Sequence, residues 1–258
     1  MTGAEATLGV LVGVGAGVLS GMFGVGGGIV TTPAVNTILG GSAISAVATP
    51  LPVIVPTSLA GAATYARAGE VSFRAARWAA LPGIAGAIGG ALVTDVIDVH
   101  LLLLVTALLM GWTAISVARG RRPSTPWVKG ETPGWKYAAI GAVAGTVSGL
   151  LGVGGGIVMV PAFTTVVGMP LRRALGTSLV VIVVLAIPGT IVHWLLGHID
   201  WAIFAALAVG VVPGARLGAR IALGVRERTL RILVAAFLGI VAVLYGIREF
   251  VELTEMGG

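Results

Sequence analysis

Charged residues are scarce in this chain, and one long part of it has none. Only 10% of the 258 residues are Asp, Glu, Lys or Arg, whereas about one quarter is typical of soluble globular domains. No charged residue occurs between Glu5 and Arg67, a stretch far longer than the ~18 apolar residues that indicate a membrane span. The composition therefore predicts an integral membrane protein embedded in a lipid bilayer.

The chain also has no cysteine. Disulfides, thiolate chemistry and cysteine-ligated zinc or iron–sulfur sites are therefore excluded. No cluster of His, Asp or Glu lies within the apolar segments, and so we predict no catalytic residue, no metal site, no cofactor and no enzymatic activity. The start, MTGAEATLG, has no basic residue before its apolar run and lacks the pattern of a cleaved signal peptide.

The excess of basic residues has two interpretations. A net charge of +6 is compatible with acidic or nucleic-acid partners. In a membrane protein, however, arginines in the loops fix the orientation of the chain. Most basic residues here lie between the apolar segments or at their ends, and so we predict no nucleic-acid partner.

Both halves of the chain carry the same series of parts. Sliding the sequence against itself aligns Gly13–Val35 with Gly141–Phe163, with 14 identities in 23 positions. We call the shift that places Gly13 on Gly141 the repeat offset. Later pairs continue the series. Thr49 aligns with Thr177 and Gly69 with Gly197 at this offset. Pro82-Gly83 aligns with Pro213-Gly214 after a further shift of three residues. We therefore predict a first membrane repeat at 1–118, a basic cytoplasmic linker at 119–136 and a second membrane repeat at 137–258.

Each half contains four apolar segments. They cover 8–40, 43–66, 78–94 and 101–118 in the first half, and 137–169, 174–196, 201–217 and 230–247 in the second. The opening segments, 8–40 and 137–169, are the longest of their halves. As one straight helix each would be ~50 Å long, against a hydrocarbon core of ~30 Å.

The distribution of Lys and Arg decides between two topologies. Eight single crossings would place nine basic residues on one side and seven on the other. If each opening segment instead returns to the side it entered from, fifteen of the sixteen share one side, which the positive-inside rule identifies as the cytoplasm. We predict this second topology in the inner (cytoplasmic) membrane, with the basic loops cytoplasmic and both termini outside. The count leaves open whether the segment is a re-entrant hairpin or two short crossing helices.

Three crossings and one hairpin per half would place the second half upside down relative to the first. Inverted repeats are typical of secondary transporters. The predicted fold class is therefore an all-α membrane protein with two inverted-topology repeats, each made of a hairpin and three transmembrane helices.

Three consecutive glycines stand in the middle of both opening segments, in SGMFGVGGGIVTTPA from Ser20 and SGLLGVGGGIVMVPA from Ser148. Non-helical backbone at membrane depth is tolerated only where it is buried in protein or lines a water-filled cavity. We predict that each triplet is the turn of a hairpin, with a half-helix starting at about Ile29 and Ile157. The N–H groups and positive dipole of a helix start favour an anion. Close helix packing is the alternative role for these glycines.

The candidate substrate-binding residues are these two triplets and three hydroxyls nearby: Gly26, Gly27, Gly28, Gly154, Gly155, Gly156, Thr49, Thr177 and Ser178. Two roles are open for the hydroxyls, as helix caps or as donors to an oxyanion. Ser20 and Ser148 are predicted to lie at helix interfaces, and His193 to make an interfacial hydrogen bond. Because no carboxylate lies deep in a segment, a cation substrate is disfavoured.

The duplicated GxxxGxxGVGGGIVxxPA element, followed by ALGTSL at 174–179, resembles the TauE/SafE sulfite-exporter family over residues 10–247. The resemblance implies a bacterial or archaeal permease for sulfite or organosulfonate anions. The first half has Pro50 where the second has Ser178. We therefore expect the second half to contribute more side-chain contacts to the site.

Together these observations predict a secondary transporter that exports a small anion, sulfite or an organosulfonate, by alternating access at the glycine turns. Two other functions stay open: an anion channel with the same fold, and a membrane scaffold without transport. The exact substrate, the direction, the coupling ion and the homo-oligomeric state are not determined by the sequence.

Overall fold

The computed structural model of the chain describes residues 3–93, 108, 111–112, 114–119, 127–128, 131–151 and 154–256. The regular structure of these residues is helical, and they contain no β-strand. The predicted segment 101–118 and the predicted linker 119–136 lie largely outside the described residues.

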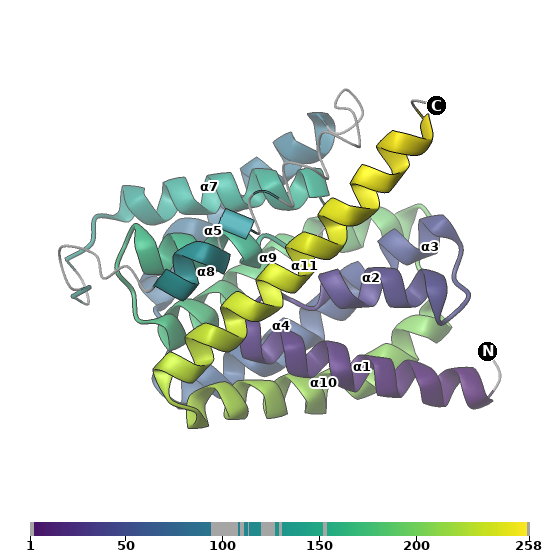
Figure 1. Cartoon of the computed structure of the whole chain (residues 1–258), viewed down its shortest axis with the longest axis horizontal. Helices are drawn as coiled ribbons and strands as arrows, with labels where there is room; N and C mark the ends of the chain where they lie inside the picture. Colours follow the sequence, from purple (N-terminus) through teal and green to yellow (C-terminus); the bar gives the residue numbers. More distant parts are fainter. Residues whose placement is uncertain are drawn as a thin grey trace.

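The helices follow one another along the chain as shown in Figure 1. They are α1 (Gly3–Phe23), α2 (Gly28–Thr37), α3 (Ala43–Ala48), α4 (Pro50–Arg67), α5 (Phe73–Val93), α7 (Gly134–Leu151), α8 (Gly156–Thr165), α9 (Leu171–Leu195), α10 (Trp201–Gly224) and α11 (Glu227–Met256).

Each opening segment forms a long helix followed by a short one. α1 has 21 residues and α2 has 10, which correspond to about 31 Å and 15 Å of helix. In Figure 1 α1 begins at the end of the molecule marked N, and α3, which follows α2, lies at the same end. The chain thus turns back after α1. The observed starts of α2 and α8, Gly28 and Gly156, agree within one residue with the predicted ones.

Four helical stretches among the described residues are long and apolar enough to cross a membrane. They are Gly3–Phe23, Ile44–Arg67, Leu171–Leu195 and Trp201–Gly224. A multi-pass membrane protein therefore agrees with both the composition and the helix lengths.

The first half breaks a helix that the second half keeps whole. α9 runs without interruption for 25 residues, whereas the equivalent stretch is divided into α3 and α4 at Thr49. Pro50 has no N–H group to donate to the carbonyl one turn earlier, but Ser178, its equivalent at the repeat offset, has one. The proline therefore explains the division.

Glycine faces join two pairs of helices. Cβ atoms added to Gly13 and Gly17 of α1 would each lie 2.5 Å from a backbone oxygen of α10, that of Leu207 or Val211. Gly145 of α7 contacts Gly83 of α5 in the same way. Small residues let helix backbones approach this closely, and so glycine packs α1 on α10 and α7 on α5.

These contacts recur at the repeat offset. Gly214 faces Val14, and Gly86 faces Ala142, so that Gly86 is the equivalent of Gly214 and Val14 the equivalent of Ala142. The expected shift of three at Pro82 is therefore wrong. Contact between small residues sets the register of these helices. Pro82 and Pro213 lie at positions that are not equivalent in this register.

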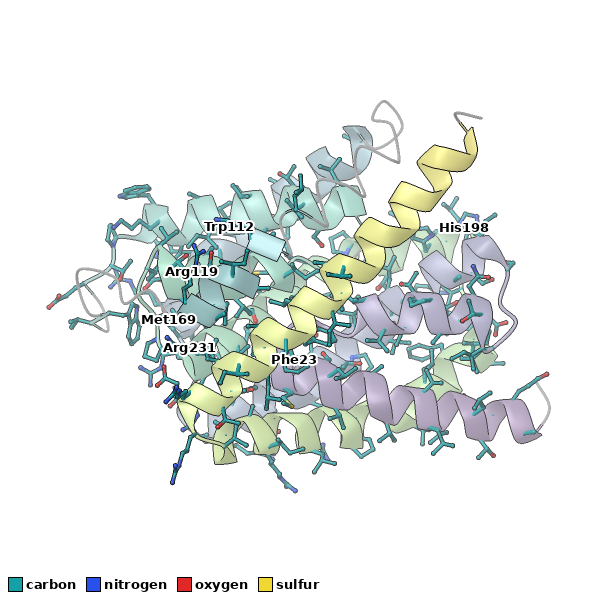
Figure 2. All side chains as sticks on the ribbon, in the orientation of Figure 1. Phe23, Trp112, Arg119, Met169, His198 and Arg231 are labelled. Carbon is teal, nitrogen blue, oxygen red and sulfur yellow. The ribbon has the colours of Figure 1, made fainter. Side chains whose placement is uncertain are left out.

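Figure 2 shows which residues lie at the two ends of the molecule. Arg119 and Arg231 lie toward one end, and His198 lies toward the other. The start of α1 and the end of α11 lie toward the same end as each other (Figure 1).

Candidate functional site

The glycine triplets form the turns between α1 and α2 and between α7 and α8. Gly26 and Gly27 have φ angles of 83° and 89°, and Gly154 and Gly155 have 82° and 65°. Residues with a side chain rarely adopt positive φ angles, whereas glycine adopts them freely. The prediction that the triplets are turns is confirmed, and the turns are buried.

The two turns touch each other inside the protein. A Cβ atom added to Gly154 would lie 3.5 Å from the carbonyl oxygen of Val25. One added to Gly156 would clash with the carbonyl oxygen of Gly24. The structure thus places the second glycine triplet against Gly24 and Val25, which immediately precede the first triplet in the other half of the sequence.

Two isoleucines lie against both turns. A Cβ on Gly26 would lie 2.9 Å from Cγ2 of Ile182 and 3.4 Å from Cγ2 of Ile54, and a Cβ on Gly154 would contact the same two side chains. Both isoleucines are buried. The two turns therefore share these apolar side chains, whereas the residues before the two helix starts, Gly27 and Gly155, have partly different neighbours.

Polar side chains surround the start of α2. A Cβ on Gly27, the residue before α2, would lie 3.8 Å from Oγ of Ser20 and 3.5 Å from Cγ2 of Thr57. A Cβ on Gly26 would lie 3.6 Å from Oγ of Ser58. No side chain caps this helix start, so its first N–H groups have the orientation and the partial positive charge that bind anions.

Two of these hydroxyls have no hydrogen-bond partner among the described residues. Ser20 and Ser58 are both 0% exposed, and neither Oγ atom makes a hydrogen bond. Their neighbours differ, since Thr31 donates to the Gly27 carbonyl at 3.1 Å and Thr57 to the Val53 carbonyl. Hydroxyls on helices usually donate to a carbonyl one turn earlier. Sequence reasoning assigned Ser20 to a helix interface and did not single out Ser58.

The start of α8 is more apolar. A Cβ on Gly155 would meet the Ala144 carbonyl at 2.9 Å, Cε of Met159 at 3.3 Å and Cβ of Ser148 at 3.4 Å. At the repeat offset, the second half has Met159 in place of Thr31, Leu185 in place of Thr57 and Ala186 in place of Ser58. This difference between the halves is readable in the sequence once the turns are known to be lined by α4 and α9.

Thr49 and Thr177 join the two halves at equivalent positions. Oγ1 of Thr49 accepts a hydrogen bond from the N–H of Asp200 at 3.1 Å, and Oγ1 of Thr177 accepts one from Ser72 at 3.0 Å. Thr49 makes no side-chain cap on its own helix. Each hydroxyl therefore holds the residue before a helix of the opposite half, Asp200 before α10 and Ser72 before α5. This bond is neither of the two roles that the sequence left open, a helix cap or a donor to an oxyanion.

Ser178 also bonds across the halves. Its hydroxyl faces the Gly24 carbonyl at 3.0 Å and the Leu175 carbonyl at 2.8 Å. A serine hydroxyl has one proton, and here that proton is used on carbonyls of the protein. The expectation that the second half supplies more side-chain contacts to the site stays a prediction, and the buried hydroxyls without a hydrogen bond among the described residues, Ser20 and Ser58, lie near the first turn.

His193 lies within hydrogen-bond distance of a second histidine, and its predicted place at the membrane interface stays a prediction. Its Nδ1 atom lies 3.3 Å from Nδ1 of His198, at the end of the molecule that carries His198 in Figure 2. His193 lies in the last turn of α9 and His198 on the α9–α10 connection, and the glycine turns have other neighbours.

Comparisons with known proteins identify relatives of this chain. The model of the family "Sulfite exporter TauE/SafE" matches residues 9–245. A probable membrane transporter protein of Xylella fastidiosa is 30% identical over 206 residues, which cover 78% of this chain and 79% of that protein. A probable membrane transporter protein of Bacillus subtilis is 26% identical and covers 94% and 96%. No solved structure gives a significant match to the chain. With the matched region extending over both glycine turns and the helices around them, the chain belongs to the TauE/SafE sulfite exporter family.

Proposed function

We propose that the protein is a secondary transporter that exports small anions, sulfite or an organosulfonate, by alternating access. The observation that carries this proposal is the pair of buried glycine turns, which touch each other and are each followed by the start of a half-helix. Helix starts bind anions without a cationic side chain. The sequence has no Lys or Arg between residues 1 and 66, and so backbone and hydroxyl donors are the groups available at the first turn.

Alternating access requires two halves that can exchange roles, and inverted repeats provide them. The contacts between α4 and α9 support this arrangement. Gly61 faces Leu179, and Gly189 faces Leu51, so the residue numbers rise in opposite directions along the two helices. α4 and α9 are equivalent at the repeat offset, and equivalent helices that run antiparallel are expected of inverted repeats.

The threonine bonds provide contacts that would alternate. Thr177 bonds to Ser72 near the α4–α5 connection, and Thr49 bonds to Asp200 near the α9–α10 connection. Near the former, Arg173 pairs with Glu70 at 3.4 Å. In the proposed cycle one of these cross-half contacts breaks when the corresponding end opens. The site at the centre is then exposed to one side at a time.

The distribution of charge supports an orientation in the inner membrane with the basic end in the cytoplasm. Arg119 and Arg231 share one end of the molecule (Figure 2). In the proposed orientation both termini and the α9–α10 connection face outward.

Uptake into proteoliposomes tests the function. Purified protein should carry sulfite or small sulfonates with saturable kinetics and counter-transport, in a panel that also includes sulfate and thiosulfate. Single-channel currents would instead identify a channel. Absence of both flux and binding for every anion would leave a membrane scaffold as the function and refute the proposal.

A further inference from the structure

The two unpaired hydroxyls at the start of α2 require an explanation. A buried hydroxyl without a hydrogen bond costs ~1–3 kcal/mol, because its desolvation is not offset. Ser20 on α1 and Ser58 on α4 are both in this condition, the first with its Oγ near Gly27 and the second with its Oγ near Gly26. Two unrelated helices thus direct unused donors toward one helix start.

The surroundings of this helix start favour an anion over a cation. A helix N-terminus carries a partial positive charge and presents N–H donors. The neighbouring Thr31 and Thr57 have used their own protons on carbonyls, so the free protons at this point belong to Ser20 and Ser58. A ligand that accepts several hydrogen bonds at once, as an oxyanion does, fits such a set of donors.

The charge of the ligand follows from the side chains nearest to Gly26 and Gly27, all of which are uncharged: Ser20, Ile54, Thr57, Ser58 and Ile182. Residues 6–66, which include α2 and the serines, contain no Lys, Arg, Asp or Glu. A buried ion without a counter-charge is costly, and the cost rises steeply with its charge. Neutral donors are therefore suited to a monoanion and poorly suited to a dianion.

From these features we infer a subsite for a singly charged oxyanion head group, such as a sulfonate or hydrogen sulfite, at the start of α2, bound by Ser20, Ser58 and the backbone N–H groups of the first glycine turn. The inference rests on the proposed transport function and specifies its site. The second turn has no equivalent subsite, because Ala186 and Met159 stand where the first half has Ser58 and Thr31.

Binding to the purified full-length chain tests the subsite, with methanesulfonate and sulfate as probes. Both probes are tetrahedral, but methanesulfonate carries one negative charge and sulfate carries two. We expect the wild type to bind methanesulfonate at least about tenfold more tightly than sulfate. Ser20→Ala and Ser58→Ala should each raise the methanesulfonate dissociation constant about tenfold or more, as expected for a hydrogen bond to a charged group.

Ser148→Ala is the matched control, because Ser148 is the equivalent of Ser20 at the second turn. The dissociation constant of methanesulfonate for this variant should equal that for the wild type. Thermal unfolding without ligand separates a binding role from a structural one. Loss of an unpaired hydroxyl should leave the midpoint unchanged or raise it, whereas loss of a structural hydrogen bond would lower it.

The outcomes distinguish the subsite from the function. If the wild type binds and transports anions but neither serine variant weakens binding, the subsite is wrong and the function stands. Equal weakening by Ser148→Ala, lower unfolding midpoints of the ligand-free serine variants, or tighter binding of sulfate than of methanesulfonate would also overturn the inference. If the wild type neither binds nor transports any anion, the proposed function fails first.

Discussion

At the scale of single residues, the glycines of the two triplets are required for different reasons. Gly27 and Gly155 adopt positive φ angles, which a side chain would strain wherever it pointed. Gly156 has no such angle, but its missing Cβ makes room for the carbonyl oxygen of Gly24. The first reason concerns the local backbone, and the second concerns contact between two distant turns.

Gly156→Ala isolates the second reason. The added methyl group should push the two turns apart, lower stability by about 1–3 kcal/mol as overpacking does, and abolish most of the transport. Thermal unfolding and proteoliposome uptake would measure these effects. Gly89→Ala is the control, since nothing lies within 4 Å of its Cβ position, and it should preserve both. Wild-type flux in Gly156→Ala would show that the contact between the turns is dispensable.

At the scale of elements, the helices of the two halves associate through small residues. α1 contacts α10 along one face, which includes Gly13 and Gly17, while Gly15 is exposed on another face. In a membrane, helices gain little from burying apolar area and depend on close van der Waals packing. The spacing of these glycines therefore determines which helix face is internal.

Substituting the same side chain on the two faces of α1 tests this account. Gly17→Leu would meet the backbone of Val211 and Ala215 and should destabilise the fold by at least about 1–3 kcal/mol. Gly15→Leu has open space at its Cβ and should be neutral or slightly stabilising, because leucine forms helix better than glycine. Unfolding in detergent would rank the two variants. Similar midpoints would contradict the packing of α1 on α10.

At the scale of the whole molecule, the proposed inversion places equivalent positions of the two halves on opposite sides of the membrane. Ala68 and Leu196 are such a pair at the repeat offset, and both are exposed in the connections that follow α4 and α9. Because the chain has no cysteine, a single introduced thiol can be labelled without background.

Labelling of intact cells with a membrane-impermeant maleimide tests the inversion and the orientation together. Leu196→Cys should react, because the α9–α10 connection is predicted to face outward. Ala68→Cys should react only after the cells are opened. Uptake by both variants would confirm that the fold is retained. Equal labelling of the two thiols in intact cells would refute inverted repeats, and the reverse pattern would refute the orientation.

The sequence by itself determined the class of the protein, the places where the chain turns and the start of each half-helix. These features depend on local chemistry, since uncharged runs enter a bilayer and glycine triplets interrupt a helix. Pro50 likewise accounts locally for the division between α3 and α4. The repeat offset, a property of the sequence alone, also matched the contacts between helices.

Only the tertiary structure decided which polar groups meet at the turns. It assigned the hydroxyls of Thr49, Thr177 and Ser178 to bonds between the halves, and it left those of Ser20 and Ser58 unpaired beside α2. At the turns themselves the equivalent residues Gly27 and Gly155 have partly different neighbours, because each turn is lined by helices from distant parts of the chain. Hydrogen-bond partners are set by such long-range packing, which no local pattern encodes.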